Sequence, residues 1–145
     1  MPASVAASIS PEDLADGRKL IDGKTIRTIV QQNLTASSGL VALAGGGLSA
    51  STPVVLSYIS EFTTVASAND SCALPPAIQG LEYEIVNSGA QTLRVYCNAA
   101  NPANAGAADN IVAAGGANST YVSVPANAVG VFSATALGRW KSQNQ

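Results

Sequence analysis

The stretch "GLEYEIVNSGAQTLRVY" (residues 80–96) decides the fold. Apolar and polar residues alternate on both sides of Asn87-Ser88-Gly89-Ala90, a group of residues that favours turns. Successive residues of a strand point to opposite faces of a sheet, so this period of two predicts two strands with one buried face. We therefore predict a β-hairpin with Arg94 and Tyr96 on its exposed face, where Arg94 could lie opposite one of two glutamates. The side chains predicted to face the core are Leu81, Tyr83, Ile85, Leu93 and Val95.

Short runs of the same kind recur along the rest of the chain. They are rich in β-branched and aromatic residues and end at turn-forming glycines, prolines and asparagines; the clearest are residues 54–67, 121–124 and 128–134. Many short strands with frequent turn signals predict an all-β fold, an antiparallel β-sandwich or barrel.

The first part of the chain differs in composition, because charged residues crowd before Arg27 and are sparse afterwards. We therefore predict an N-terminal arm, residues 1–35, and a β-sandwich or barrel body, residues 36–145. Within the arm we predict a short helix from Pro11 to Asp16, with Ser10 as its N-terminal cap and Gly17 as the residue that stops it.

Residues 24–33 allow two interpretations, and the sequence does not choose between them. Ile26, Ile29 and Val30 share one face of a helix, yet the run of β-branched residues also favours a strand. In either form the element is too small to bury its own apolar side, so we expect it to dock on a body or on a partner.

Composition excludes several classes of function. The 145-residue chain has 7 Lys plus Arg and a net charge of −2, too little positive charge for the basic stripe of a nucleic-acid binder. Its apolar runs are too short to span a bilayer, and the N-terminus lacks the pattern of a secretory signal. We expect neither nucleic acid nor membrane as a partner, and assembly in a cytoplasm.

The sequence offers little catalytic chemistry. It has no histidine, which removes Ser-His-Asp and Cys-His nucleophiles and imidazole metal sites. Glu82 and Glu84 share one strand face and are interpreted as a solvated surface, while Asp70 and Asp109 are interpreted as turn formers that could alternatively hold calcium. We predict no enzyme, with no catalytic residue, metal site or cofactor.

Three further side chains have two interpretations each. Cys72 and Cys97 flank the predicted hairpin and are interpreted as small buried thiols, the alternative being a disulfide. Trp140 is interpreted as a core residue that closes the last strand, the alternative being an exposed ligand platform.

Two longer segments, residues 62–100 and 122–140, resemble a β-module that recurs in virion proteins of tailed bacteriophages. The resemblance lies in a "TTVA" strand, an "LP-A--G" link, a "VN-GA--L-VY" segment and a closing "F-----G-W". The matching positions after Thr63-Thr64-Val65-Ala66 are Leu74, Pro75, Ala77, Gly80, Val86, Asn87, Gly89, Ala90, Leu93, Val95, Tyr96, Phe132, Gly138 and Trp140. The module is typical of phage structural proteins in general and does not indicate their place in the virion.

The resemblance implies a non-enzymatic structural protein. The small size and charged arm look most like a head decoration (cement) protein, a homotrimer on the outer capsid surface that contacts the major capsid protein. In that interpretation the arm adheres through apolar residues buried against capsid or decoration subunits: Leu14, Leu20, Ile21, Ile26, Ile29 and Val30. The alternative is a tail-fibre, head-fibre or baseplate module that binds a receptor or glycan through residues 101–118 and an exposed aromatic residue.

Overall fold

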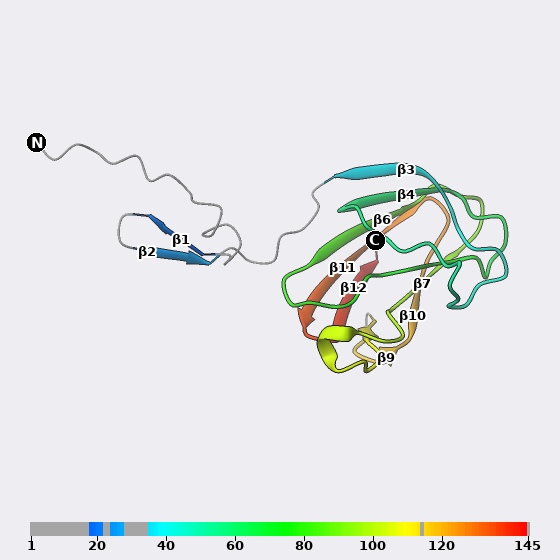
Figure 1. The fold of residues 1–145 in the computed structure, drawn as a ribbon. Coiled ribbons are helices and arrows are strands. Elements are labelled where there is room, and N and C mark those ends of the chain that lie inside the picture. Colours follow the sequence, from blue (N-terminus) through cyan, green and yellow to red (C-terminus); the bar gives the residue numbers. More distant parts are fainter. Residues whose placement is uncertain (1–17, 22–23, 28–34, 114, 145) are drawn as a thin grey trace, which may run out of the picture. The chain divides into compact units, whose positions relative to one another are not determined.

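The computed structural model describes residues 18–21, 24–27, 35–113 and 115–144 (Figure 1). The chain divides into two compact units, Met1–Gln31 and Gln32–Gln145; the arm and body boundary predicted after residue 35 stays a prediction. The helix predicted from Pro11 to Asp16 lies outside the described residues.

The first unit contains a two-stranded antiparallel sheet of β1 (Arg18–Ile21) and β2 (Lys24–Arg27). Residues 24–27 are therefore a strand, which answers part of the question left open for residues 24–33; residues 28–33 lie outside the described residues. Ile21 pairs with Lys24, so only Asp22 and Gly23 separate the paired residues. Asp-Gly is a preferred dipeptide for two-residue hairpin loops, a signal that would have predicted this pairing.

The second unit is predominantly β. Its described residues form the strands β3 (Ala36–Val41), β4 (Ile59–Thr64), β5 (Ser71–Ala73), β6 (Glu82–Asn87), β7 (Leu93–Tyr96), β8 (Asn110–Val112), β9 (Asn118–Ser119), β10 (Tyr121–Val124), β11 (Ala128–Ala136) and β12 (Arg139–Asn144), with one short 3-10 helix, η1 (Pro102–Asn104). Seven strands form one sheet in the order β3-β4-β6-β11-β12-β8-β9, and three form another in the order β10-β7-β5. Figure 1 shows β3, β4, β6, β11 and β12 following one another across the larger sheet.

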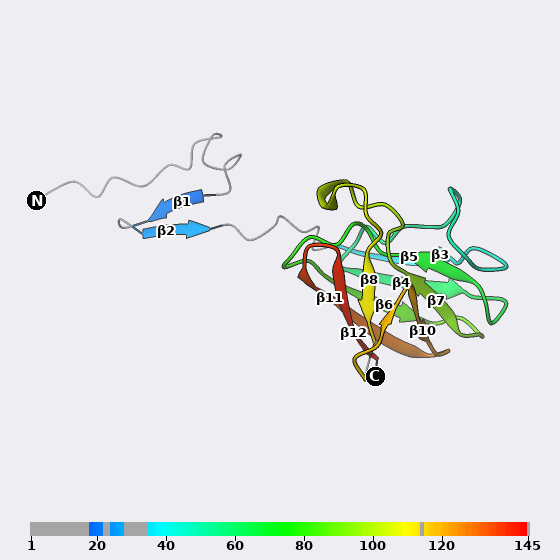
Figure 2. The ribbon, with the colours of Figure 1, turned by 90° about the horizontal axis from the view of Figure 1, so that it is seen from below.

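Both sheets of the second unit are mixed, so the predicted purely antiparallel arrangement is wrong. β4 runs parallel to both of its neighbours, β3 and β6, and β8 runs parallel to β12. In the smaller sheet β5 runs parallel to β7. Parallel neighbours need a crossover connection, and the chain supplies one by passing through β5 of the smaller sheet between β4 and β6. The antiparallel pairing of β11 with β12 is visible in Figure 2.

The predicted hairpin of residues 80–96 is wrong in its pairing, although its two strands are present. β6 pairs with β4 and β11 in the larger sheet, whereas β7 pairs with β5 and β10 in the smaller one. The predicted alternation is confirmed, because every second residue of each strand is buried. The segment therefore connects two sheets and supplies a buried face to each.

Asn87 fixes this connection. Its buried side chain donates from Nδ2 to the carbonyl oxygens of Gln91 (2.8 Å), Val124 (2.9 Å) and Pro125 (3.0 Å), and its Oδ1 accepts from the Gly89 amide at 3.0 Å. These bonds join the ends of β6 and β10 and hold the turn in a shape that leads away from β6. A two-strand hairpin would leave this amide without its partners from β10.

Gly89 brings the same turn against the end of β4. A Cβ atom at this position would lie 2.6 Å from both the backbone nitrogen and the Cβ of Val65. Such distances lie inside van der Waals contact, so only glycine fits between the connection and Val65.

The core draws side chains from the buried faces of both sheets. The larger sheet contributes Phe62, Ile85, Phe132 and Trp140, and the smaller one contributes Cys72, Leu93, Val95 and Val124. Trp140 is completely buried and meets Tyr83 edge to face with ring centroids 5.8 Å apart. The prediction that Trp140 is a core residue is confirmed.

Candidate functional site

The structure places three of the six predicted adhesive residues. Leu20 and Ile21 lie in β1 and Ile26 lies in β2, where the register pairs Leu20 with Thr25 and Ile26 with Lys19. Leu14, Ile29 and Val30 lie outside the described residues. The paired strands read RKLI and KTIR, so they combine four cationic residues with three large apolar residues and contain no carboxylate.

Glu82 and Glu84 lie on the same half-buried face of β6. The Tyr58 hydroxyl donates to Glu82 Oε1 at 3.0 Å, and the Ser133 hydroxyl donates to Oε2 at 3.3 Å. The hydrogen bond to Glu82 raises the pKa of Tyr58 above its ordinary value, because ionisation would remove the proton that this bond shares. Glu82 is therefore bound to hydroxyl groups of its own sheet face.

Asp70 and Asp109 organise loops from buried positions. Asp70 accepts from the backbone amides of Ala66 (2.8 Å) and Ser67 (3.0 Å) through Oδ2, and from that of Gly45 (3.2 Å) through Oδ1. Asp109 accepts from the Ala77 amide at 2.7 Å and from Asn101 Nδ2 at 2.9 Å. The turn-forming interpretation matches these bonds, and within the described ranges no group of three or more His, Cys, Asp or Glu is placed to hold a metal ion.

Asn101, the first residue of the loop considered for glycan binding, also serves the fold. It is completely buried and its Nδ2 donates to Ala77 O at 3.1 Å as well as to Asp109. Because the side chain of Asn101 is bonded within this internal network, Asn101 is not available to contact a ligand at the loop of residues 101–118.

Both cysteines are buried free thiols, which confirms the first interpretation. Cys72 lies in β5, and Cys97 follows β7 and donates its thiol hydrogen to the carbonyl oxygens of Asp109 (2.9 Å) and Thr120 (3.2 Å). Burial raises the pKa of Cys72, and it raises the pKa of Cys97 to about 11. Both groups are neutral thiols near pH 7, and a thiol is a far weaker nucleophile than a thiolate.

A row of side chains crosses the outer face of the smaller sheet. Ala73 in β5 pairs with Tyr96 in β7, and Tyr96 pairs with Tyr121 in β10. On the other side Ala73 makes a bridge to Val54, which precedes β4 in the sequence. Paired residues share a face of a sheet. Val54, Ala73, Tyr96 and Tyr121 therefore form one continuous row, which we call the tyrosine row.

Arg94 is held against this row. The tyrosine rings lie with centroids 5.1 Å apart and planes tilted by 38°, and Arg94 Cζ lies 4.9 Å from the centre of the Tyr121 ring. The cation is within the range of a favourable interaction with the ring face. The prediction that Arg94 lies opposite a glutamate is wrong, because β7 belongs to the other sheet and its partner at this position is Ser123.

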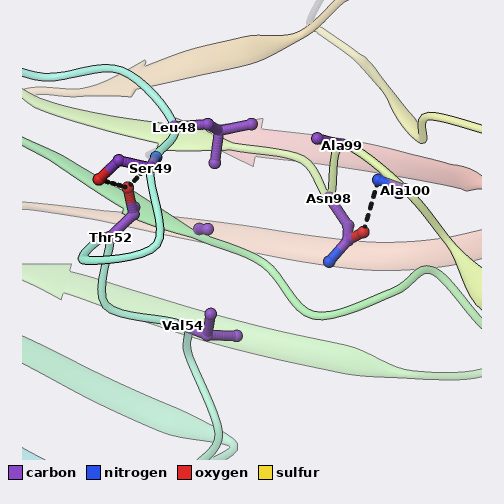
Figure 3. A pocket seen from close by; sticks show the side chains of 8 residues that line it. Leu48, Ser49, Thr52, Val54, Asn98, Ala99 and Ala100 are labelled. Atoms are coloured by element: carbon purple, nitrogen blue, oxygen red, sulfur yellow. Dashed lines mark hydrogen bonds between the residues drawn. The ribbon is translucent and has the colours of Figure 1, made fainter.

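A cavity of about 360 Å³ opens beside the tyrosine row (Figure 3). Ala73 lines it, as do Leu48 and Val54, whose side chains are 41% and 45% exposed. Figure 3 shows Ser49 and Thr52 on one side of the cavity and Asn98 to Ala100 on the other. The Asn98 side-chain oxygen accepts from the Ala100 amide at 2.9 Å, which holds this amide at the cavity edge.

The tyrosine row and its cavity were missed by the sequence analysis. Tyr96 was correctly placed on the outer side of its strand, but nothing in the sequence near Val54 or Ala73 indicates that they lie next to it. The row is a stiff aromatic and cationic surface with an adjoining apolar cavity. Tyrosine and arginine are enriched in the centres of protein interfaces.

Comparison with known proteins gives no relative: no protein-family model, no curated protein and no solved structure matches the chain. Across the described ranges no helix is long and apolar enough to cross a membrane. The fold and the tyrosine row define a mixed-β body with an aromatic and cationic row on the outer face of its smaller sheet.

Proposed function

We propose that the protein is a non-enzymatic decoration (cement) protein of a tailed-phage head. It binds the outer surface of the capsid, bridges subunits of the major capsid protein as a homotrimer, and uses its N-terminal arm for adhesion. In this proposal the seven- and three-stranded sheets form a β-sandwich body. The resemblance of residues 62–100 and 122–140 to phage virion modules supports this assignment.

The observation that carries the proposal is the separate two-stranded unit of β1 and β2. An isolated two-stranded hairpin is marginally stable in water and needs further strands or a packing surface. Its sequence holds Leu20, Ile21 and Ile26, and burial of each such side chain contributes about 1.5–3 kcal/mol before ordering costs. A capsid binds many copies of a decoration protein, so even a modest binding free energy per arm would add up to a large stabilisation of the capsid.

The test is binding of the full chain to capsids that lack it. A variant with Leu20→Ser, Ile21→Ser and Ile26→Ser is compared with the wild type in cosedimentation. Loss of three apolar contacts, each worth about 1.5–3 kcal/mol before ordering costs, predicts an affinity at least tenfold lower. Leu137→Ser, at an exposed position of the body, is the matched control and should bind as the wild type. Wild-type affinity in the triple variant would reject the adhesive role of the arm.

The tyrosine row and its cavity favour one second candidate, a glycan- or receptor-binding module of a tail fibre, head fibre or baseplate. It predicts that the isolated protein binds host cells or surface polysaccharide and that Tyr96→Ala abolishes this binding. Copy number separates the two functions, because a decoration protein approaches the abundance of the major capsid protein on a stained gel of the virion. A fibre or baseplate module is present at a small fraction of it.

A further inference from the structure

The free sheet edges of the second unit are protected in different ways, with one exception. β9 is only two residues long, β10 is followed directly by Pro125, and β5 is covered by bridges from Leu43 and Val54. Short edge strands, prolines and covering loops are the usual devices that prevent an edge from pairing with another chain. The remaining edge is that of β3.

β3 is the least protected of these edges, and its one device is an irregular register with β4 around Leu40. Its six residues, ASSGLV, include no charge and no proline, and among the described residues it pairs with β4 alone. Val41 is 60% exposed. A Cβ atom on Gly39 would meet nothing within 4 Å, so the face of the sheet is open at this residue. The edge of β3 therefore carries no charge, proline or covering side chain at Gly39 that would oppose a further strand.

The carboxylates of the second unit are distributed unevenly. Asp70 and Asp109 are buried, and the remaining three, Glu61, Glu82 and Glu84, lie on the half-buried face of β4 and β6. Glu61 lies next to the β3 edge, where it accepts hydrogen bonds from Ser38 of β3 and from Ser88. These bonds lower the pKa of Glu61 and keep it anionic. The basic residues Arg139 and Lys141 are on β12, three strands beyond β4 in the sheet order.

The chain itself contains a strand pair of the complementary charge. β1 and β2 together hold Arg18, Lys19, Lys24 and Arg27, four of the seven basic residues of the protein, and no acidic residue. Among the described residues, neither β1 nor β2 has a second neighbouring strand. A two-stranded hairpin gains stability from a further strand, and the cations of this one suit an edge that is flanked by Glu61.

We propose that the β3 edge binds the β1–β2 hairpin of a second copy of the chain, which extends the seven-stranded sheet across a subunit boundary with its cations beside Glu61. This inference rests on the adhesive role proposed for residues 1–35 and names a partner surface for it. Main-chain hydrogen bonds supply affinity in such strand addition, and the charge pairing supplies orientation.

The experiment measures self-association of the full chain without capsids, by sedimentation velocity over a range of protein concentrations. Wild type should associate, and Val41→Lys should weaken association at least tenfold, because an edge lysine opposes strand addition. Leu137→Lys places the same charge on another exposed apolar position and should associate as the wild type. Circular dichroism verifies that each variant keeps its fold.

Two charge variants identify the occupant. The pair Lys24→Glu and Arg27→Glu should weaken association as strongly as Val41→Lys, and Glu61→Gln should weaken it less and reduce its dependence on salt. Unchanged association in the Lys24 and Arg27 pair, together with loss in Val41→Lys, would mean that the edge pairs with something other than the hairpin and would overturn the proposal. A wild type that stays monomeric, or a Val41→Lys variant that associates normally, would also overturn it. Capsid binding is measured separately, so failure here leaves the decoration function to its own test.

Discussion

Replacement of Asn87 by alanine tests the account of how residues 80–96 connect two sheets. The side chain is completely buried, and its amide bonds three carbonyl oxygens and one backbone amide from two segments of the chain, the turn after β6 and the end of β10. Two amide hydrogens serve the three carbonyls, so at least one bond is shared. Asn87→Ala leaves these backbone groups without their partner in a site closed to solvent.

A buried polar group that loses its hydrogen-bond partner costs about 1–3 kcal/mol. Partial relaxation of the structure lets some of the four backbone groups find another partner, so the four costs do not simply add. We therefore expect Asn87→Ala to lower the free energy of unfolding by about 3–5 kcal/mol, at the upper end of single substitutions. That loss is a large share of the stability of a small domain, which is about 5–15 kcal/mol in total.

Urea unfolding followed by fluorescence measures this loss, and Trp140, the single tryptophan, reports on the core. Asn98→Ala is the matched control, because Asn98 makes one hydrogen bond at an exposed position, to the Ala100 amide. Its effect should stay below about 1 kcal/mol. A loss of less than about 1 kcal/mol in Asn87→Ala as well would refute the reasoning that this side chain determines the connection.

Two further predictions concern stability. Gly89→Ala should lower the melting temperature by about 5 °C or more, because the added Cβ meets Val65 at 2.6 Å and the turn must shift. Ser88→Ala, at the neighbouring exposed position, should change the melting temperature little. Equal effects of the two substitutions would contradict the close approach of Gly89 to Val65. The raised pKa of Cys97, about 11 against an ordinary 9.0, means that the folded state keeps a proton which the unfolded state releases. The contribution of Cys97 to the free energy of unfolding should therefore be constant below pH 9 and fall between pH 9 and 11, by about 1 kcal/mol per pH unit, so the total fall in this range should be smaller in Cys97→Ala. A Cys97→Ala variant with the same slope as the wild type would show that this thiol does not titrate on unfolding.

Local sequence predicted the strands well and their partners poorly. The alternation in residues 82–87 and 93–96 correctly identified which side chains are buried, since this depends only on the period of the strand. The hairpin prediction failed because a turn sequence says where the chain changes direction, and not which sheet it enters next. That outcome depends on Asn87, whose partners in β10 lie far away in the sequence.

The candidate surface shows the same limit. The outward orientation of Tyr96 followed from alternation, but the tyrosine row needs Val54, Ala73 and Tyr121 from three other segments. Arg94 was assigned to a glutamate by the predicted pairing and in fact lies on an aromatic ring. Side-chain neighbours across a sheet are set by strand order, which no single segment encodes.

By itself the sequence determined that the protein is predominantly β, that Trp140 and the cysteines belong in its interior, and that its charge is concentrated near the N-terminus. These properties follow from composition and from periods of a few residues, which act locally. Only the tertiary structure decided the mixed strand order, the division of residues 80–96 between two sheets, and the exposed edge of β3. They depend on contacts between distant segments, where burial of the whole core outweighs the preference of any one turn.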